Sequence, residues 1–161
     1  DFHIPIAGYS PAKIRMPHKN SHGQYDNWNA TALPWMSIGY ETQVPPISTL
    51  TFYNAIANGG KMMKPRFVKQ IIKNGEVVYN NPPQVIKEHI AKESTIKEIT
   101  RILTEVVSEG LGKKAGSDKF LVAGKTGTAQ MSKGALGYKA GGTNYLLSFA
   151  GFFPADKPRY S

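Results

Sequence analysis

Four consecutive residues, Lys125-Thr126-Gly127-Thr128, have the types and spacing needed to bind a substrate that bears a carboxylate. A lysine at the rim of a cleft supplies positive charge for the carboxylate, and the two threonine hydroxyls can donate hydrogen bonds to it. Gly127 has no Cβ, so the backbone of a ligand can lie close to it. An extended peptide could pair with this segment as an added strand, and the N–H of Thr128 could help to stabilise an oxyanion.

The alternation of side chains along a strand sets a condition on this site. Lys125 and Gly127 fall on one face of a strand, whereas Thr126 and Thr128 fall on the other. All four can serve one cleft if the strand twists or forms the edge of the cleft. A solvated strand end is the alternative interpretation, because a Lys-Thr-Gly triplet occurs by chance in many proteins.

The residues around the motif predict two antiparallel strands that would position it. An apolar run at 120–123 predicts a buried strand that continues through the motif, and a second apolar run predicts a strand at 145–153. The Gly-rich residues 132–144 predict a mobile connection between the two strands. We therefore expect Lys125 to Ala129 to pair antiparallel with residues near Leu147 to Phe152.

Upstream of the strands, the sequence predicts a helix and a hairpin. Pro46 opens the helix, apolar residues recur at 47, 50, 53 and 57, and Gly59-Gly60 end it. Asn74-Gly75 lies between two runs rich in β-branched residues, which is the strongest short signal for a β-hairpin. We expect this hairpin to stand off the main body, with Asn54 and Asn58 as surface or cap residues of the helix.

A second helix is predicted to start at Ser94 or Thr95 and to end at Gly110. Thr95 with Glu98 fits a capping box, and the helix has one apolar stripe, made of Ile96, Ile99, Leu103, Val106 and Val107. Residues 1–45 show no sustained period, and they predict irregular loops pinned by Trp28, Trp35 and Tyr40.

Composition limits the classes of function. The chain of 161 residues with 40% hydrophobic residues is long enough to bury a core, and it has no cysteine, which excludes disulfides, cysteine-ligated zinc and a cysteine nucleophile. The formal charge is +9, but no run of five basic residues occurs. We therefore expect no nucleic-acid partner, and an anionic polymer would suit the charge equally well.

Two further patterns are weaker candidates for sites. His18 and His22 have the i, i+4 spacing of a metal site on a helix, but Pro17 and Gly23 argue against a helix there, so we expect solvated loop histidines and no metal. The segment Gly110 to Lys114 lacks the spacing of a phosphate-binding loop, and it is interpreted as a helix exit.

The string Ala-Gly-Lys-Thr-Gly-Thr-Ala-Gln at 123–130 resembles the third signature motif of class B penicillin-binding proteins. Other blocks resemble the same family in the same order, from about residue 35 to the end: Ser37 to Glu41, Tyr53 to Gly60, Val106 to Gly110, and Ser148 to Asp156. The division-type transpeptidases look most similar, and elongation-type relatives are the alternative.

This resemblance implies an α+β fold in which an antiparallel sheet is flanked by helices, as in the serine β-lactamases. It implies a D,D-transpeptidase of septal cell-wall synthesis, whose serine attacks the D-Ala-D-Ala end of a peptidoglycan stem peptide and whose acyl-enzyme is resolved by the amine of a second stem. β-Lactams would acylate the same serine. The resemblance also implies divisome or cell-wall synthesis partners, no cofactor, and a location at the extracytoplasmic face of the bacterial cytoplasmic membrane, held by an N-terminal anchor outside this chain.

The resemblance also assigns expected roles within the motif. Lys125 would belong to the hydrogen-bond and charge network of the active site. Thr126 and Thr128 would hold the substrate carboxylate, and the N–H of Thr128 would form half of the oxyanion hole beside Gly127. Gln130 would flank the substrate channel.

Two motifs of this family are expected to lie outside this sequence. The family needs Ser-x-x-Lys for its nucleophile and base, and Ser-x-Asn for proton transfer. Ser10-Pro11-Ala12-Lys13 has the residue types of Ser-x-x-Lys, but it contains proline, whereas the nucleophile should start a buried helix. It also leaves too few residues before the later blocks for Ser-x-Asn and its helices. We expect both motifs to precede Asp1, so that residues 1–161 are the C-terminal portion of one transpeptidase domain and are inactive alone. The alternatives are a non-catalytic module that binds a peptide or partner, and a serine β-lactamase or β-lactam sensor.

Overall fold

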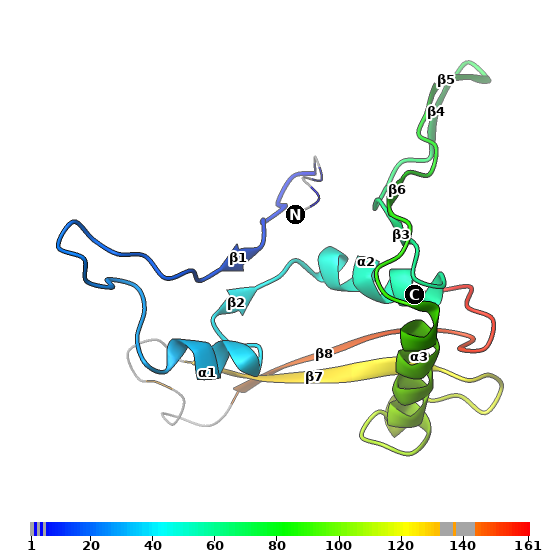
Figure 1. Ribbon diagram of the computed structural model, residues 1–161. Coiled ribbons are helices and arrows are strands. Elements are labelled where there is room, and N and C mark those ends of the chain that lie inside the picture. The colour runs from blue at the N-terminus through cyan, green and yellow to red at the C-terminus, as the bar shows by residue number, and fades with distance from the viewer. Residues whose placement is uncertain (1, 3, 5, 133–136, 138–143) are drawn as a thin grey trace. The chain divides into compact units, whose positions relative to one another are not determined.

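The computed structural model describes two compact units, 1–48 and 49–161, and the boundary falls inside a helix. Figure 1 shows the elements along the chain. The residues described are 2, 4, 6–132, 137 and 144–161.

The first unit is a loop-rich segment with one short ladder and one short helix. Strand β1 (Lys13–Ile14) pairs antiparallel with β2 (Thr42–Gln43). Helix α1 (Ala32–Ser37) lies between them in sequence, where only irregular loops were predicted. That prediction was wrong because a helix of six residues is too short to show a period.

Aromatic and polar contacts hold parts of this unit together. The rings of Trp35 and Tyr40, two of the three aromatic residues predicted to pin these loops, meet edge to face with their centroids 5.2 Å apart. Arg15 forms an ion pair with Glu41 at 2.7 Å. Such loops need side-chain hydrogen bonds because their backbone groups have few ladder partners.

Helix α2 (Pro46–Ala57) confirms the predicted first helix and its end. Gly59 and Gly60 both have positive φ, at 65° and 95°, as a left-handed helix terminus requires. The predicted apolar face was right only in part. Tyr53 and Ala57 pack against the core, but Leu50 is 37% exposed, and the fully buried residues are Thr51, Ala55 and Ile56.

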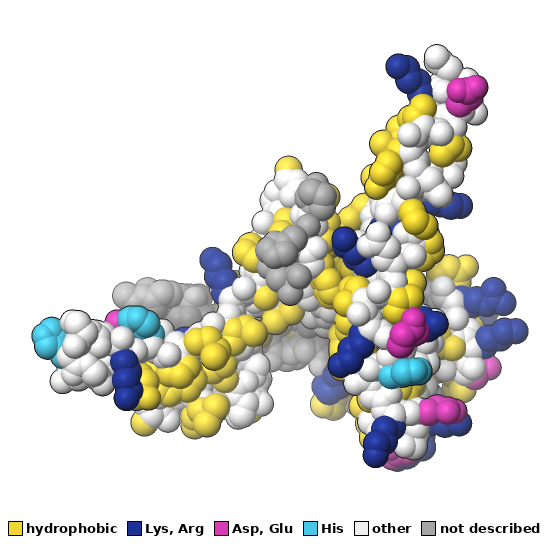
Figure 2. Space-filling model, turned by 45° about the horizontal axis from the view of Figure 1, so that its top comes forward, with side chains coloured by type: hydrophobic (Ala, Val, Ile, Leu, Met, Phe, Trp, Pro, Cys, Tyr) yellow, Lys and Arg dark blue, Asp and Glu magenta, His cyan; other side chains and the backbone are white. Residues whose placement is uncertain are grey.

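An arm of four short strands follows α2. Strand β3 (Met62–Met63) pairs with β6 (Val85–Lys87), and β4 (Gln70–Lys73) pairs with β5 (Glu76–Asn80), both antiparallel. Asn74 and Gly75 have φ of 53° and 83°, which confirms the predicted hairpin turn. Every residue of β4, β5 and β6 is exposed, and hydrophobic and basic side chains lie along the arm (Figure 2).

Helix α3 (Glu93–Ser108) confirms the second predicted helix and its apolar stripe. Ile96, Leu103 and Val107 are buried. The predicted capping box was wrong, since Lys92 occupies the N-cap and no side chain caps the helix. The segment after α3 was interpreted as the exit from a helix, and it contains a short 3₁₀ turn, η1 (Lys113–Ala115).

Strands β7 (Ala123–Met131) and β8 (Asn144–Phe152) confirm the predicted antiparallel pair. Their register runs without a bulge from Ala123 opposite Phe152 to Met131 opposite Asn144. The strand begins at Ala123 rather than at residue 120. Most of the Gly-rich connection predicted to be mobile lies outside the described residues.

The core of the second unit lies where α2 and α3 meet the base of β7 and β8. Its buried cluster comprises Ile56, Ile96, Leu103, Ala123, Phe152 and Ala155. This packing of helices on antiparallel strands confirms the α+β class. Within the described part of the chain, no helix is both long and apolar enough to cross a membrane.

Candidate active site on strand β7

Strand β7 carries the whole predicted motif beyond its buried base. Ala123 and Gly124 are buried, Lys125 and Thr128 are exposed, and Thr126 and Gly127 are half-buried. The first two residues anchor the strand in the core, and the motif then extends out of it. A substrate could therefore reach the motif while its backbone is held at one end.

The two faces of the strand carry different groups, as alternation predicted. Lys125 and Gly127 lie opposite Ala150 and Ser148, on the face that begins with Ala123 in the core. Residues directly opposite each other in an antiparallel pair share a face. The ammonium of Lys125 thus projects on the same face as the hydroxyl of Ser148.

The second face carries the polar residues expected to contact a substrate. Thr126 lies opposite Phe149, and Thr128 lies opposite Leu147. Gln130 follows on this face and is half-buried. Three polar side chains therefore line one face of β7 along alternate residues.

The charge of Lys125 is not neutralised by any acidic residue in the described part of the chain. Its Nζ donates a hydrogen bond of 2.8 Å to the carbonyl oxygen of Thr126, the next residue of the same strand. An ammonium group can make three hydrogen bonds. This arrangement leaves donors that a carboxylate ligand could accept.

Gly127 leaves space for a side chain of the opposite strand. A Cβ built at this position would overlap Oγ of Ser148 across the ladder, so the hydroxyl of Ser148 would have to rotate away. Gly127 has no positive φ, so it is not explained by an unusual backbone conformation. Ser148 and its neighbour Phe149 were not predicted as site residues, because their position opposite the motif depends on the register of two strands joined by a long connection.

The alternative nucleophile at Ser10 has none of the surroundings that its chemistry needs. Ser10 is exposed and lies outside any helix, and Lys13 is an exposed residue of β1. A nucleophilic serine needs a nearby base within hydrogen-bond reach. These surroundings do not favour Ser10 as a nucleophile, and the absence of the nucleophile from this chain stays a prediction.

The two histidines considered as metal ligands lie in the first unit, His18 in an irregular segment and His22 in a turn. His18 lies 3.0 Å from Asp26, from Nδ1 to Oδ1, and this hydrogen bond lowers the pKa of the Asp26 carboxyl. His22 is exposed. Among the described residues, no three histidine or acidic side chains are grouped as metal ligands.

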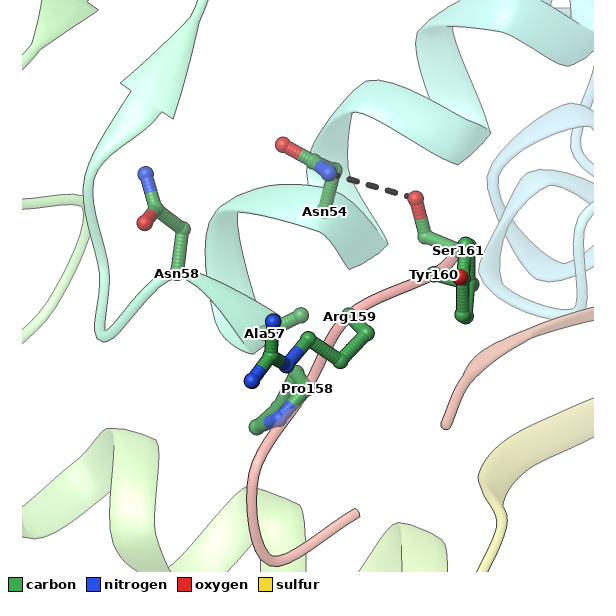
Figure 3. Close-up of a pocket in the computed structure, with 7 residues that line it drawn as sticks. All are labelled: Asn54, Ala57, Asn58, Pro158, Arg159, Tyr160 and Ser161. Carbon is green, nitrogen blue, oxygen red and sulfur yellow. Dashed lines mark hydrogen bonds between the residues drawn. The ribbon is translucent and has the colours of Figure 1, made fainter. Parts of the chain in front are cut away.

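A polar pocket of about 310 Å³ lies elsewhere in the second unit (Figure 3). One wall is the last turn of α2, with Asn54, and the residue after the helix, Asn58. The other wall is the segment 158–161. Nδ2 of Asn54 donates to Oγ of Ser161 at 3.2 Å, and Asn58 donates to the carbonyl of Lys61, which confirms both as surface or cap residues. No residue of the motif lines this pocket.

Comparison with known proteins identifies the family. Residues 8–161 match the family model described as the penicillin binding protein transpeptidase domain. Stage V sporulation protein D of Bacillus subtilis is 36% identical over 124 residues, which cover 76% of this chain and 19% of that protein. A peptidoglycan D,D-transpeptidase FtsI homolog of Mesostigma viride is 27% identical over 169 residues, which cover 98% of this chain and 27% of that protein.

Solved structures agree with this match. Penicillin binding protein 3 of Mycobacterium tuberculosis superimposes with a TM-score of 0.67 at 29% identity, covering 84% of this chain and 31% of that one. The D,D-transpeptidase domain of a peptidoglycan glycosyltransferase from Eggerthella lenta gives 0.61 at 28% identity, covering 74% and 26%. The chain spans about a fifth of the length of the first curated relatives that it matches. The chain belongs to the penicillin-binding protein transpeptidase family, which confirms the resemblance inferred from its motif.

Proposed function

We propose that this chain is the C-terminal part of the transpeptidase domain of a penicillin-binding protein that cross-links peptidoglycan stem peptides. The observation that carries the proposal is the motif Lys125 to Thr128, which extends from the core on a long antiparallel strand in a chain that matches this family over residues 8–161. The net charge of +9 suits an anionic cell wall.

The geometry supports different roles for the polar residues on the two faces of β7. Lys125 supplies positive charge on one face, with its ammonium already anchored by one hydrogen bond to Thr126. Thr126 and Thr128 hold the carboxylate of a D-Ala-D-Ala terminus, and Gln130 flanks the channel along which the stem peptide lies. The N–H of Thr128 contributes to the oxyanion hole, where a backbone donor stabilises charge that develops during attack.

The reaction requires a serine that this chain does not supply. The nucleophile and base of Ser-x-x-Lys, and the proton-transfer group of Ser-x-Asn, lie before Asp1 in this proposal. The serine oxygen attacks the penultimate D-Ala carbonyl, D-Ala leaves, and the amine of a second stem peptide takes over the acyl group. No cofactor or metal takes part in this acyl transfer.

The proposed ligands include β-lactams, which acylate the same serine. A M. tuberculosis relative that is 29% identical has been solved in complex with aztreonam. The FtsI homolog and the sporulation protein among the relatives favour a role in division or septum formation, with divisome proteins as partners. The domain then works on the extracytoplasmic side of the cytoplasmic membrane, held by an N-terminal anchor.

The test is acylation of the full-length protein by a fluorescent penicillin, followed on a denaturing gel. We expect one covalent label per molecule, mapped by mass spectrometry to the serine of an upstream Ser-x-x-Lys. The same protein should release D-Ala from a stem peptide that ends in D-Ala-D-Ala. A protein that binds the peptide without label or release would instead be a non-catalytic binding module, and hydrolysis of penicillin at a high turnover would indicate a β-lactamase.

A further inference from the structure

We propose that Phe149 of β8 is a positioning residue, which holds the start of the Lys-Thr-Gly-Thr motif by laying its ring over a pair of glycines. This inference rests on the proposed function, because it concerns the rate of the acylation described above. It adds a residue on the strand opposite the motif, to which no role in the site was assigned from the sequence.

The ring of Phe149 lies over Gly124 and Gly151, which are opposite each other in the ladder. A Cβ built at Gly124 would overlap Cζ of the ring and would lie 2.9 Å from Cε2. A Cβ built at Gly151 would lie 2.9 Å from Cε1. The carbonyl oxygens of Ala150 and Ala123 would also lie too close to a Cβ at Gly124 and Gly151, respectively. The ring therefore covers two positions that have no room for a side chain.

Neither glycine is explained by its backbone conformation. Both lack the positive φ that favours glycine, and both sit inside regular strands, where glycine loses conformational entropy and packs nothing. An aromatic residue placed over strand glycines restores the lost packing. The pair of glycines and the ring are thus best understood as one unit.

This unit lies directly beneath the motif. Gly124 immediately precedes Lys125, and Phe149 lies opposite Thr126 on the same face of the ladder. Opposite Cβ atoms in such a pair are about 5 Å apart. The ring therefore restrains both the backbone from which Lys125 projects and the side chain of Thr126.

The exposure of Phe149 separates this role from simple core packing. Phe149 is 44% exposed, whereas Phe152, three residues later, is completely buried in the core. Removing the Phe149 ring therefore removes restraint at the motif more than it removes buried apolar surface. Small displacements of positioning groups can slow an enzyme by about a hundredfold.

The experiment uses the full-length protein with Phe149→Leu and Phe149→Ala. Leucine keeps an apolar side chain without the flat ring. The rate constant can therefore still be measured in this variant if the alanine variant does not fold. Tyr79→Ala is the matched control, because Tyr79 is also a strand aromatic opposite another residue and is 49% exposed, but it lies on the arm. Four quantities are measured: the acylation rate constant at saturating penicillin, the concentration that gives half this rate, the final labelled fraction, and the melting temperature.

We expect Phe149→Ala to lower the saturating rate constant by at least about tenfold, and Phe149→Leu to lower it less, with complete labelling at the end point in both. Tyr79→Ala should match the parent. If both Phe149 variants reach the parent rate constant, or if only the labelled fraction and the melting temperature fall, the positioning role is wrong and the proposed function still stands. If the parent protein is never labelled, the proposed function fails and this inference fails with it.

Discussion

The ammonium group of Lys125 and the hydroxyl of Thr128 are exposed on opposite faces of β7. Among the described residues, no acidic side chain pairs with Lys125, whose ammonium donates a hydrogen bond to the carbonyl of Thr126. A residue in this setting contributes little to core burial. Its chemical effect therefore falls mainly on a bound ligand.

We predict that Lys125→Ala slows acylation of the full-length protein by penicillin by about ten- to a hundredfold. A hydrogen bond to a charged group contributes roughly 1.5–3 kcal/mol, and about 1.4 kcal/mol corresponds to a tenfold change in rate. Thr128→Val keeps the backbone N–H and should slow acylation less. The rates are measured by quenching the reaction with fluorescent penicillin at a series of times and reading the labelled protein on a denaturing gel.

The control for this prediction is Lys73→Ala, which removes an exposed lysine at the end of β4. It should acylate at the parent rate, and none of the three variants should change the melting temperature appreciably. Parent rates in both Lys125→Ala and Thr128→Val, with unchanged stability, would show that this motif does not line the substrate site.

Among the elements, the contact of α3 with the base of β7 and β8 determines how firmly the motif is held. Phe152 and Ala123 are completely buried, and they pack with Leu103 and Ile96 of α3. The motif emerges two residues after Ala123. Loosening this contact should therefore affect both stability and the site.

We predict that Phe152→Ala destabilises the protein by about 3–5 kcal/mol, because it deletes a large buried side chain and leaves a cavity. Leu111→Ala is the control, since Leu111 is 91% exposed, and it should change stability by less than about 0.5 kcal/mol. Both are measured by urea denaturation followed by circular dichroism. Equal midpoints for the two variants would contradict the placement of the core.

The exposed face of α3 carries charges that should make its stability depend on pH. Lys97 donates to Glu93 and Arg101 donates to Glu98, each at 2.7 Å, and these hydrogen bonds lower the pKa of both carboxyls. A carboxyl whose pKa is depressed in the folded state stabilises that state above its unfolded pKa. The contribution is lost as the pH falls through the folded pKa.

We therefore predict that the melting temperature falls as the pH drops below about 4.5, the ordinary pKa of these groups. Arg101→Ala should show a shallower fall, because it removes the partner that depresses the pKa of Glu98. Lys114→Ala, a basic residue of η1, should keep the slope of the parent. The effect should be small and weaker in high salt, since these pairs are exposed, and identical slopes in all three proteins would contradict it.

On the scale of the whole molecule, the chain exposes apolar residues that a complete domain would be expected to cover. Leu146 and Leu147 of β8 are 62% and 72% exposed, next to the proposed site. The chain also spans about a fifth of its first curated relatives. Both observations agree with a site that needs residues from outside these 161.

We predict that the 161-residue chain alone forms no covalent adduct with penicillin, because Ser10 lies outside any helix, and Lys97, the lysine three residues after Ser94, is ion-paired with Glu93. Incubation with fluorescent penicillin and a denaturing gel tests this directly, and the full-length protein is the positive control. A stoichiometric band from the chain alone would overturn the prediction, and its loss in Ser10→Ala would assign the nucleophile to Ser10.

Much of the local structure could be predicted from the sequence. The turn at Asn74-Gly75, the end of α2 at Gly59-Gly60 and the apolar stripe of α3 each depend on residues within one or two turns of the chain. The same holds for the two long strands, whose apolar runs mark them. The family resemblance was also local, because it rests on short blocks such as 123–130.

The tertiary structure decided the features that depend on residues far apart in sequence. The buried face of α2 coincides only in part with its apolar stripe, because it depends on residues far along the chain: Ile56 joins a core cluster with Ile96 and Ala123. The proposed capping box at Thr95 failed because the preceding backbone enters the helix earlier, at Glu93. Ser148 and Phe149 could be placed over the glycines of β7 only once the register with β8 was known, since a long connection allows many registers and only side-chain packing across the ladder selects one.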